Sequence, residues 1–287
     1  MAGLHRSQQR GQSIEFSQHR EYVPGDDLRQ IDWKVYARSD KFYLRQYEDE
    51  TNLSCFMLLD QSSSMQYQGS DSAMNKSDYA KLVVASLSFL MILQQDQVGL
   101  VEFTKQIDAW LPASSAMHHF EDISKLLEES RPMNDSHTDV AAMLTQLIGR
   151  VSKPSLFVLM SDFLHEEKTD AAGQLKSLGE AMRLAKFAGH DLIVLQVLDG
   201  DELDFSFSDV TQFEGLESNE ELQVDPSYIR RAYQEAITSH CQKIEACARR
   251  QDFDYYLMRT DEQLSATLPE ILAKRFSNRP ASRRGSV

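Results

Sequence analysis

The chain has 287 residues, a formal net charge of −14 at pH 7 and a sequence pI near 5.0. This acidic balance argues against nucleic acid or an anionic membrane surface as a main partner, because both would repel the protein. No run of about eighteen apolar residues occurs, so we expect no integral membrane segment. The first residues lack the apolar stretch of a signal peptide, and the three cysteines lack metal-ligand spacing; both features predict a cytoplasmic protein with reduced thiols.

The first part of the chain, residues 1–50, is polar, charged and aromatic, with little clean periodicity. The run Pro24-Gly25-Asp26-Asp27 is typical of a turn. Apolar residues spaced by three or four predict a short helix over 27–38, and imperfect alternation predicts an extended segment over 41–50. We therefore separate residues 1–50 from the rest, as a segment that packs on the main domain.

From residue 53 onward, short apolar runs alternate with longer helical patterns. Buried strands are predicted at 53–60, 98–103, 154–162, 191–199 and 254–260. Helices are predicted at 76–95, 116–129, 138–151, 170–189, 225–250 and after a capping box at 260–263. Hairpin strands are predicted at 106–111, beside the second strand, and within 203–216.

This alternation predicts an α/β fold over residues 51–275. Strands joined through helices form a doubly wound, mostly parallel sheet with helices on both faces. The last residues, 276–287, are polar and basic, and we expect them to be disordered.

Polar residues follow two of the predicted strands at the point where each strand ends. Asp60 ends an apolar run, with Ser62 and Ser64 after it at a spacing of two, and Asp162 ends another run. Ligands of such sheets bind at the carboxyl ends of the strands, where the loop residue Thr138 can add a further hydroxyl. Oxygen ligands of this kind suit Mg²⁺, or else Mn²⁺ or Ca²⁺.

An isolated Asp-x-Ser more often caps a helix or a turn than it binds a metal. The additional hydroxyls and the second aspartate shift the balance to a divalent-cation site. Met65 and Tyr67, which follow the serines, are then expected to line the exposed face around the ion and to contact a partner. The predicted metal ligands are Asp60, Ser62, Ser64, Thr138 and Asp162.

Three short motifs, Asp60-Gln61-Ser62-Ser63-Ser64, Thr138-Asp139 and Ser161-Asp162, resemble the metal-ion-dependent adhesion site of von Willebrand factor A domains. The segment before them resembles the signature of domain-of-unknown-function family fifty-eight. The matching residues are Arg20, Tyr22, Pro24 to Asp27, Arg29, Ile31 to Trp33, and Ala37-Arg38.

The resemblance implies a von Willebrand A fold in a non-catalytic adaptor. Such proteins are thought to work with a MoxR-type AAA+ ATPase on a client protein, in protein maturation or metal insertion. It also implies ligand roles: Ser62, Ser64 and Thr138 bind the ion directly, and Asp60 and Asp162 bind it through water. A Glu or Asp of the partner fills the sixth position.

Charged residues of the signature have a physical interpretation of their own. Arginines interleaved with aspartates predict a buried or half-buried ion network that fixes this segment on the main domain, beside buried Trp33 and Tyr36. A solvated charged surface is the alternative. The residues in question are Arg20, Tyr22, Asp26, Asp27, Arg29, Asp32, Trp33 and Arg38.

Two other functions remain open from the sequence. Asp60 at a strand end is similar to the nucleophile of haloacid-dehalogenase phosphohydrolases, but Ser62 stands where that chemistry needs a second Asp as general acid. The third possibility is a structural A domain that binds its partner without metal. We predict that the protein is not an enzyme.

Overall fold

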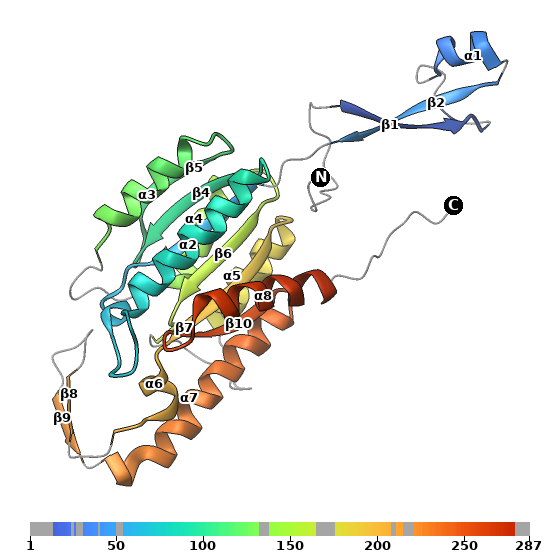
Figure 1. Cartoon of the computed structure of the whole chain (residues 1–287). Helices are drawn as coiled ribbons and strands as arrows, with labels where there is room; N and C mark the ends of the chain where they lie inside the picture. Colours follow the sequence, from blue (N-terminus) through green and yellow to red (C-terminus); the bar gives the residue numbers. More distant parts are fainter. Residues whose placement is uncertain are drawn as a thin grey trace. The chain divides into compact units, whose positions relative to one another are not determined.

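A computed structural model of the chain describes residues 14–23, 26, 31–39, 41–49, 54–131, 138–164, 176–207, 211–214, 221–224 and 226–278. The chain divides into two compact units, Met1–Leu53 and Ser54–Val287 (Figure 1). Packing of the first segment on the main domain stays a prediction.

The first unit is a two-stranded ribbon with one helix. Strand β1 (Ile14–Glu21) pairs antiparallel with β2 (Tyr43–Asp49), and α1 (Trp33–Ser39) lies between them in sequence. The extended segment predicted over 41–50 is confirmed by β2. Strand β1 was missed because a register irregularity between Phe16 and Gln18 breaks its alternation.

Helix α1 begins later than predicted, because Asp32 accepts hydrogen bonds from the backbone N–H groups of the residues two and three further on. Ile31 and Leu44 form the small buried centre of this unit. Burial of Trp33 was predicted wrongly: its side chain is 59% exposed. A seven-residue helix on a narrow ribbon can bury only one side, and Trp33 lies on the other.

The predicted ion network is seen in part. Arg20 and Asp26 form a 2.7 Å ion pair, with side chains 42% and 24% exposed. The backbone N–H of Val23 and the Arg20 guanidinium lower the pKa of Asp26. Arg38 is exposed. Tyr22 contacts the Phe42 ring edge-on, whereas Asp27 and Arg29 lie outside the described residues.

The second unit is built on a six-stranded sheet with the order β10-β7-β6-β3-β4-β5 (Figure 1). All neighbouring strands are parallel except β5, which runs antiparallel to β4 as the hairpin prediction required. The strands are β3 (Ser54–Asp60), β4 (Gln97–Phe103), β5 (Ile107–Ser114), β6 (Leu156–Ser161), β7 (Asp191–Leu198) and β10 (Asp254–Arg259). The predicted doubly wound, mostly parallel α/β fold is confirmed.

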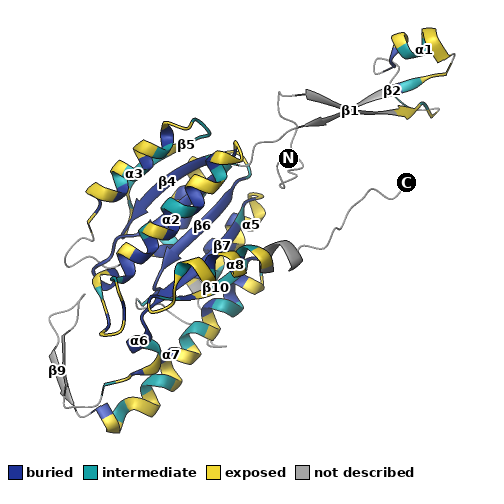
Figure 2. Cartoon of the chain, in the orientation of Figure 1, coloured by how far each residue is buried: buried dark blue, intermediate teal, exposed yellow. Residues whose placement is uncertain are grey.

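Helices cover both faces of this sheet. They are α2 (Lys76–Leu93), α3 (His119–Glu129), α4 (Val140–Arg150), α5 (Lys176–Phe187), α6 (Gly200–Asp204), α7 (Pro226–Arg249) and α8 (Leu264–Asn278), with a 3-10 turn, η2, at Ser63–Gln66. Figure 2 shows the consequence: the central strands are buried, whereas the helices expose their outer sides.

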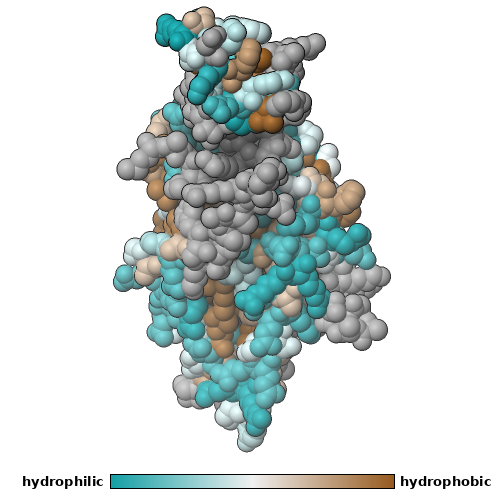
Figure 3. Space-filling view, turned by 90° about the vertical axis from the view of Figure 1, so that its right-hand side faces the viewer, coloured by the Kyte–Doolittle hydropathy of each residue, from teal (hydrophilic) through white to brown (hydrophobic). Residues whose placement is uncertain are grey.

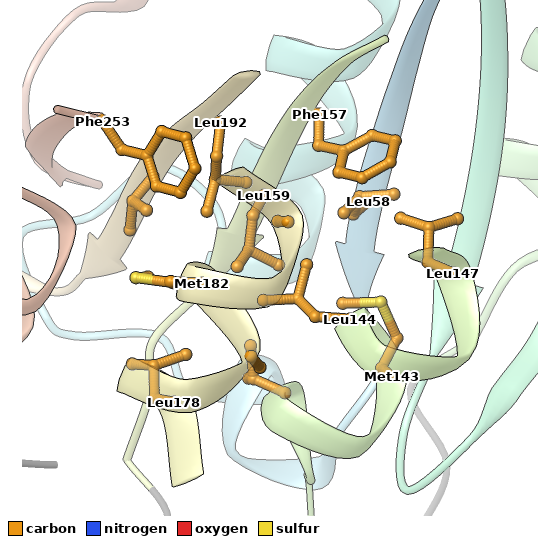
Figure 4. Packing of buried hydrophobic residues seen from close by; sticks show 14 of the residues in the cluster. Leu58, Met143, Leu144, Leu147, Phe157, Leu159, Leu178, Met182, Leu192 and Phe253 are labelled. Atoms are coloured by element: carbon orange, nitrogen blue, oxygen red, sulfur yellow. The ribbon is translucent and has the colours of Figure 1, made fainter. Parts of the chain in front are cut away.

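The central strands are mainly apolar because both faces of the sheet are covered. In β3, Phe56 and Leu58 point into a core cluster with α4, α5 and α7, while Met57 and Leu59 are buried among the side chains of the other face. Figure 4 shows part of the first cluster, in which Leu144 of α4 lies against the strands. Burial of each such side chain stabilises the folded state by about 1.5–3 kcal/mol.

The predicted hairpin within 203–216 was partly wrong. Residues 203 and 204 end helix α6, because Asp199 and Glu202 form a capping box that starts a helix there. A hairpin does follow, between β8 (Thr211–Glu214) and β9 (Glu221–Val224). Helix α8 also continues to Asn278, beyond the predicted domain end at 275.

Figure 3 shows one side of the molecule as mainly hydrophilic, with a narrow strip of hydrophobic surface. In the described part of the chain, none of the helices combines the length and the hydrophobicity needed to cross a membrane.

Candidate metal-ion site

The predicted ligands come from loops at one edge of the sheet. Asp60 is the last residue of β3, and Asp162 follows β6, its parallel neighbour. Thr138 precedes α4, where Asp139 caps the helix and donates its backbone N–H to the carbonyl of Thr104. That bond attaches the loop of Thr138 to the end of β4. The carboxyl ends of three adjacent strands therefore hold the site.

Asp60 is the centre of this group and is completely buried. Its Oδ1 accepts hydrogen bonds from the Ser62 backbone N–H at 2.9 Å and the Thr138 hydroxyl at 2.8 Å. Its Oδ2 accepts one from the Ser161 hydroxyl at 2.5 Å. Ser161 was not predicted as a site residue; its place as the last residue of a strand next to β3 is the signal that would have found it.

The serines connect Asp60 to the second carboxylate. Ser62 caps the 3-10 turn η2, and its Oγ lies 3.1 Å from the Oγ of Ser64. The Ser64 hydroxyl in turn hydrogen-bonds Asp162, whose Oδ1 also accepts from the Leu164 backbone N–H. The five predicted ligands thus lie in one continuous hydrogen-bond network.

The two carboxylates differ in electrostatic environment. Burial and the charge of Asp162 raise the pKa of Asp60 to about 7. Burial also acts to raise the pKa of Asp162, but the Lys76 ammonium outweighs it and holds that pKa below the ordinary value. Among the described residues, no basic side chain forms an ion pair with Asp60. Within the described residues, Asp60 is therefore a buried carboxylate that no basic side chain neutralises.

The donor set fits a hard divalent cation. It consists of two carboxylates and three hydroxyls, and the described residues contain no group of three or more His, Cys, Asp or Glu that would hold a metal. Binding would therefore depend on the hydroxyls, which suit Mg²⁺ better than Zn²⁺. Ser64 and Thr138 are 9% and 7% exposed, whereas Asp60 and Ser62 are 0% exposed, so the network reaches solvent at Ser64 and Thr138.

The family model described as "Protein of unknown function DUF58" matches residues 18–243. The chain belongs to this family. The uncharacterized protein Rv1480 of Mycobacterium tuberculosis is 23% identical over 271 residues, which cover 92% of this chain and 80% of that protein. The family predicted from the N-terminal signature is thus confirmed.

Solved structures resemble the fold. The conserved hypothetical protein BatB from Bacteroides thetaiotaomicron has 17% identity and a TM-score of 0.50, covering 79% of this chain and 100% of that chain. The SpRpn10 VWA domain has 9% identity and a TM-score of 0.43, covering 83% and 100%. At this level of identity, the likeness to BatB is one of fold alone.

In this DUF58 protein Met65 and Tyr67, which follow the serines, differ in burial. Met65 was predicted to line the exposed face, and this was wrong: it is 0% exposed. The tight 3-10 turn directs Met65 toward the domain interior. Tyr67 is half-buried, with its ring 5.9 Å from the Lys76 ammonium, and it remains the candidate partner contact.

Lys76 is a site residue that the sequence analysis missed. Its Nζ donates hydrogen bonds of 2.7 Å to Asp162 and 2.7 Å to Glu202, and its side chain is fully buried. A lysine at the start of a mainly apolar helix is expected to extend into solvent from the first turn. Its distance in sequence from both acids concealed the contact.

A second network fixes the loop that follows the serines. Asp199 accepts hydrogen bonds from the Gly69 backbone N–H and from the hydroxyls of Ser72 and Thr260. A Cβ at Gly69 would lie only 2.0 Å from an Asp199 oxygen, so this approach needs glycine. The loop between η2 and α2 is thereby attached to the ends of β7 and β10.

Proposed function

We propose that this DUF58 protein is a non-catalytic, metal-dependent interaction module. Its site would bind one divalent cation, Mg²⁺ first and Mn²⁺ or Ca²⁺ as alternatives. The observation that carries the proposal is Asp60: a fully buried carboxylate, close to a second one, surrounded by hydroxyls and lacking a basic partner among the described residues. A bound cation would offset the repulsion between the two acids.

The resemblance to adhesion sites assigns a role to each ligand. The hydroxyls of Ser62, Ser64 and Thr138 would contact the ion, and the two aspartates would hold it through water. Because the two aspartates would bind only through water, the ion would keep one coordination position open for a further carboxylate. The solvent-accessible side at Ser64 and Thr138 is where a Glu or Asp of a partner would complete the coordination.

The partner we propose is a MoxR-type AAA+ ATPase, with the module acting as its adaptor toward a client protein in maturation or metal insertion. Support comes from membership of the DUF58 family and from the resemblance of residues 60–64 to adhesion sites. The half-buried Tyr67 lies next to the site and would take part in the contact.

A phosphohydrolase is disfavoured by the same geometry. An attacking Asp60 would need an oxygen open to the phosphorus atom, but both of its oxygens accept hydrogen bonds and the side chain is 0% exposed. Ser62 at the second position is a poor general acid for a leaving group.

The test is capture of a MoxR-type ATPase from the same genome by the purified full chain, in Mg²⁺ and in EDTA. Wild type, Asp60→Ala and the control Asp122→Ala would be compared; Asp122 is an exposed carboxylate on α3. We expect binding by wild type and control in Mg²⁺ only, and none by Asp60→Ala. Binding that is unchanged by EDTA and by Asp60→Ala would support a metal-independent domain. Hydrolysis of p-nitrophenyl phosphate by wild type and control, but not by Asp60→Ala, would support the enzyme.

A further inference from the structure

Lys76 lies at the start of α2 and is held there by local contacts. Asn75 caps the helix by accepting from the Asp78 backbone N–H at 2.7 Å. The Lys76 backbone N–H donates to the carbonyl of Tyr67 at 3.1 Å, which joins the helix start to the loop after the serines. The side chain is 0% exposed. The lysine is therefore fixed beside the ion site rather than extended into solvent.

The ammonium group of Lys76 is shared between two carboxylates. Its Nζ lies 2.7 Å from Asp162 Oδ2 and 2.7 Å from Glu202 Oε1. Glu202 has a second attachment, because its other oxygen accepts the Asp199 backbone N–H at 2.8 Å. Asp162 thus presents its Oδ2 to Lys76 and its Oδ1 to the Leu164 backbone N–H, and it also accepts from the Ser64 hydroxyl.

The charges of this group can be counted. Asp60, Asp162 and Glu202 carry three negative charges when ionised, and Lys76 carries one positive charge, which leaves a net charge of −2. One divalent cation would neutralise the cluster. Without metal, Lys76 is the basic group that the described residues supply to it.

We propose that Lys76 is the resident counter-ion of the metal site. It holds Asp162 in position when no metal is bound, and its charge repels an incoming cation, so it lowers metal affinity while keeping the empty site assembled. Glu202 attenuates this repulsion because it shares the ammonium. The inference rests on the proposed cation site and identifies Lys76 as the residue that sets the affinity of that site for the metal ion.

This arrangement predicts effects of opposite sign for two substitutions. Lys76→Met removes the positive charge, so Mg²⁺ should bind at least about tenfold more tightly. Glu202→Gln keeps the side-chain shape and an oxygen for Lys76 but removes the compensating negative charge, so Mg²⁺ should bind severalfold more weakly. If Lys76 were only a packing residue, its loss would weaken binding or leave it unchanged.

Isothermal titration of the full chain with MgCl₂ tests the inference, with Lys81→Met as the matched control. Lys81 is on the same helix, and its Nζ donates to the carbonyl of Ser130 rather than to a site carboxylate. We expect tighter binding in Lys76→Met, weaker binding in Glu202→Gln and no change in the control. In EDTA, thermal unfolding of Lys76→Met should occur at a lower temperature than that of wild type, because two carboxylates lose their cation.

The outcomes separate the two proposals. If wild type takes up no Mg²⁺, Mn²⁺ or Ca²⁺, both the site and the counter-ion role are refuted. If wild type binds but Lys76→Met binds no more tightly, only the counter-ion role is refuted. Should Lys76→Met fail to fold, Glu202→Gln decides alone: unchanged Mg²⁺ affinity in that variant would overturn the inference.

Discussion

Replacing Asp60 by asparagine should stabilise the metal-free protein at alkaline pH while abolishing its response to Mg²⁺. Burial and the neighbouring charge of Asp162 raise the pKa of Asp60 to about 7, from the 3.8 that is ordinary for an aspartate. Between these two values, the folded state retains a proton that the unfolded state has lost. The free energy of unfolding must therefore fall as pH rises through this range.

The size of the effect follows from the two pKa values. From pH 5 to pH 8, the ionisation of this carboxyl should lower the stability of the wild type by about 2–3 kcal/mol relative to a variant that cannot ionise. Asparagine is close in shape to aspartate and removes the charge. It loses part of the acceptor capacity toward Thr138 and Ser161, which offsets about 1 kcal/mol of the gain.

Urea unfolding of wild type and Asp60→Asn in EDTA, at pH 5 and pH 8, measures this difference directly. The stability of the variant relative to wild type should increase between the two pH values. Addition of Mg²⁺ at pH 8 should stabilise wild type and leave the variant unchanged, because the ion binds the ionised site. A pH dependence identical in both proteins would refute the assigned environment of Asp60.

Further predictions concern the core, a helix cap and the second network. Leu144→Ala, at a fully buried position, should cost about 2–5 kcal/mol in urea unfolding, whereas Leu82→Ala, at a position 44% exposed, should cost less than about 1; equal losses would contradict the assigned core. Asp139→Ala removes the α4 cap, so the stability should fall by about 1 kcal/mol and Mg²⁺ titration should show weaker binding, since Thr138 is adjacent. Asp199→Ala leaves buried donors without their acceptor and should cost about 1–3 kcal/mol. Burial acts to raise the pKa of Asp199, but its hydrogen bonds outweigh burial and hold that pKa below the ordinary value. The contribution of Asp199 to the free energy of unfolding should therefore be complete at pH 7 and decline in acid. A loss of stability in Asp199→Ala that does not depend on pH would contradict this assignment.

The order of strands and helices in the main domain was readable from the sequence, because hydrophobic periodicity encodes which faces are buried. β3, β4, β6 and β7 are mainly apolar, as strands covered on both faces are, with Glu102 and Gln196 as buried polar exceptions. The convergence of Asp60 and Asp162 was also predictable, since both lie at the carboxyl ends of parallel strands. Periodicity failed where local capping or a bulge overrode it, at α6 and β1.

Only the tertiary structure determined which partners surround each of these side chains. A short 3-10 turn buries Met65 one residue after an ion-site serine, and a narrow ribbon leaves Trp33 exposed. Lys76 contacts Asp162 and Glu202, residues that are 86 and 126 positions further along the chain. Burial and pairing of this kind depend on how distant segments pack together, which local patterns of residues do not encode. The sequence by itself thus determined the sheet and the cluster of oxygen-bearing side chains at its edge, whereas the folded chain decided the charge balance of this cluster.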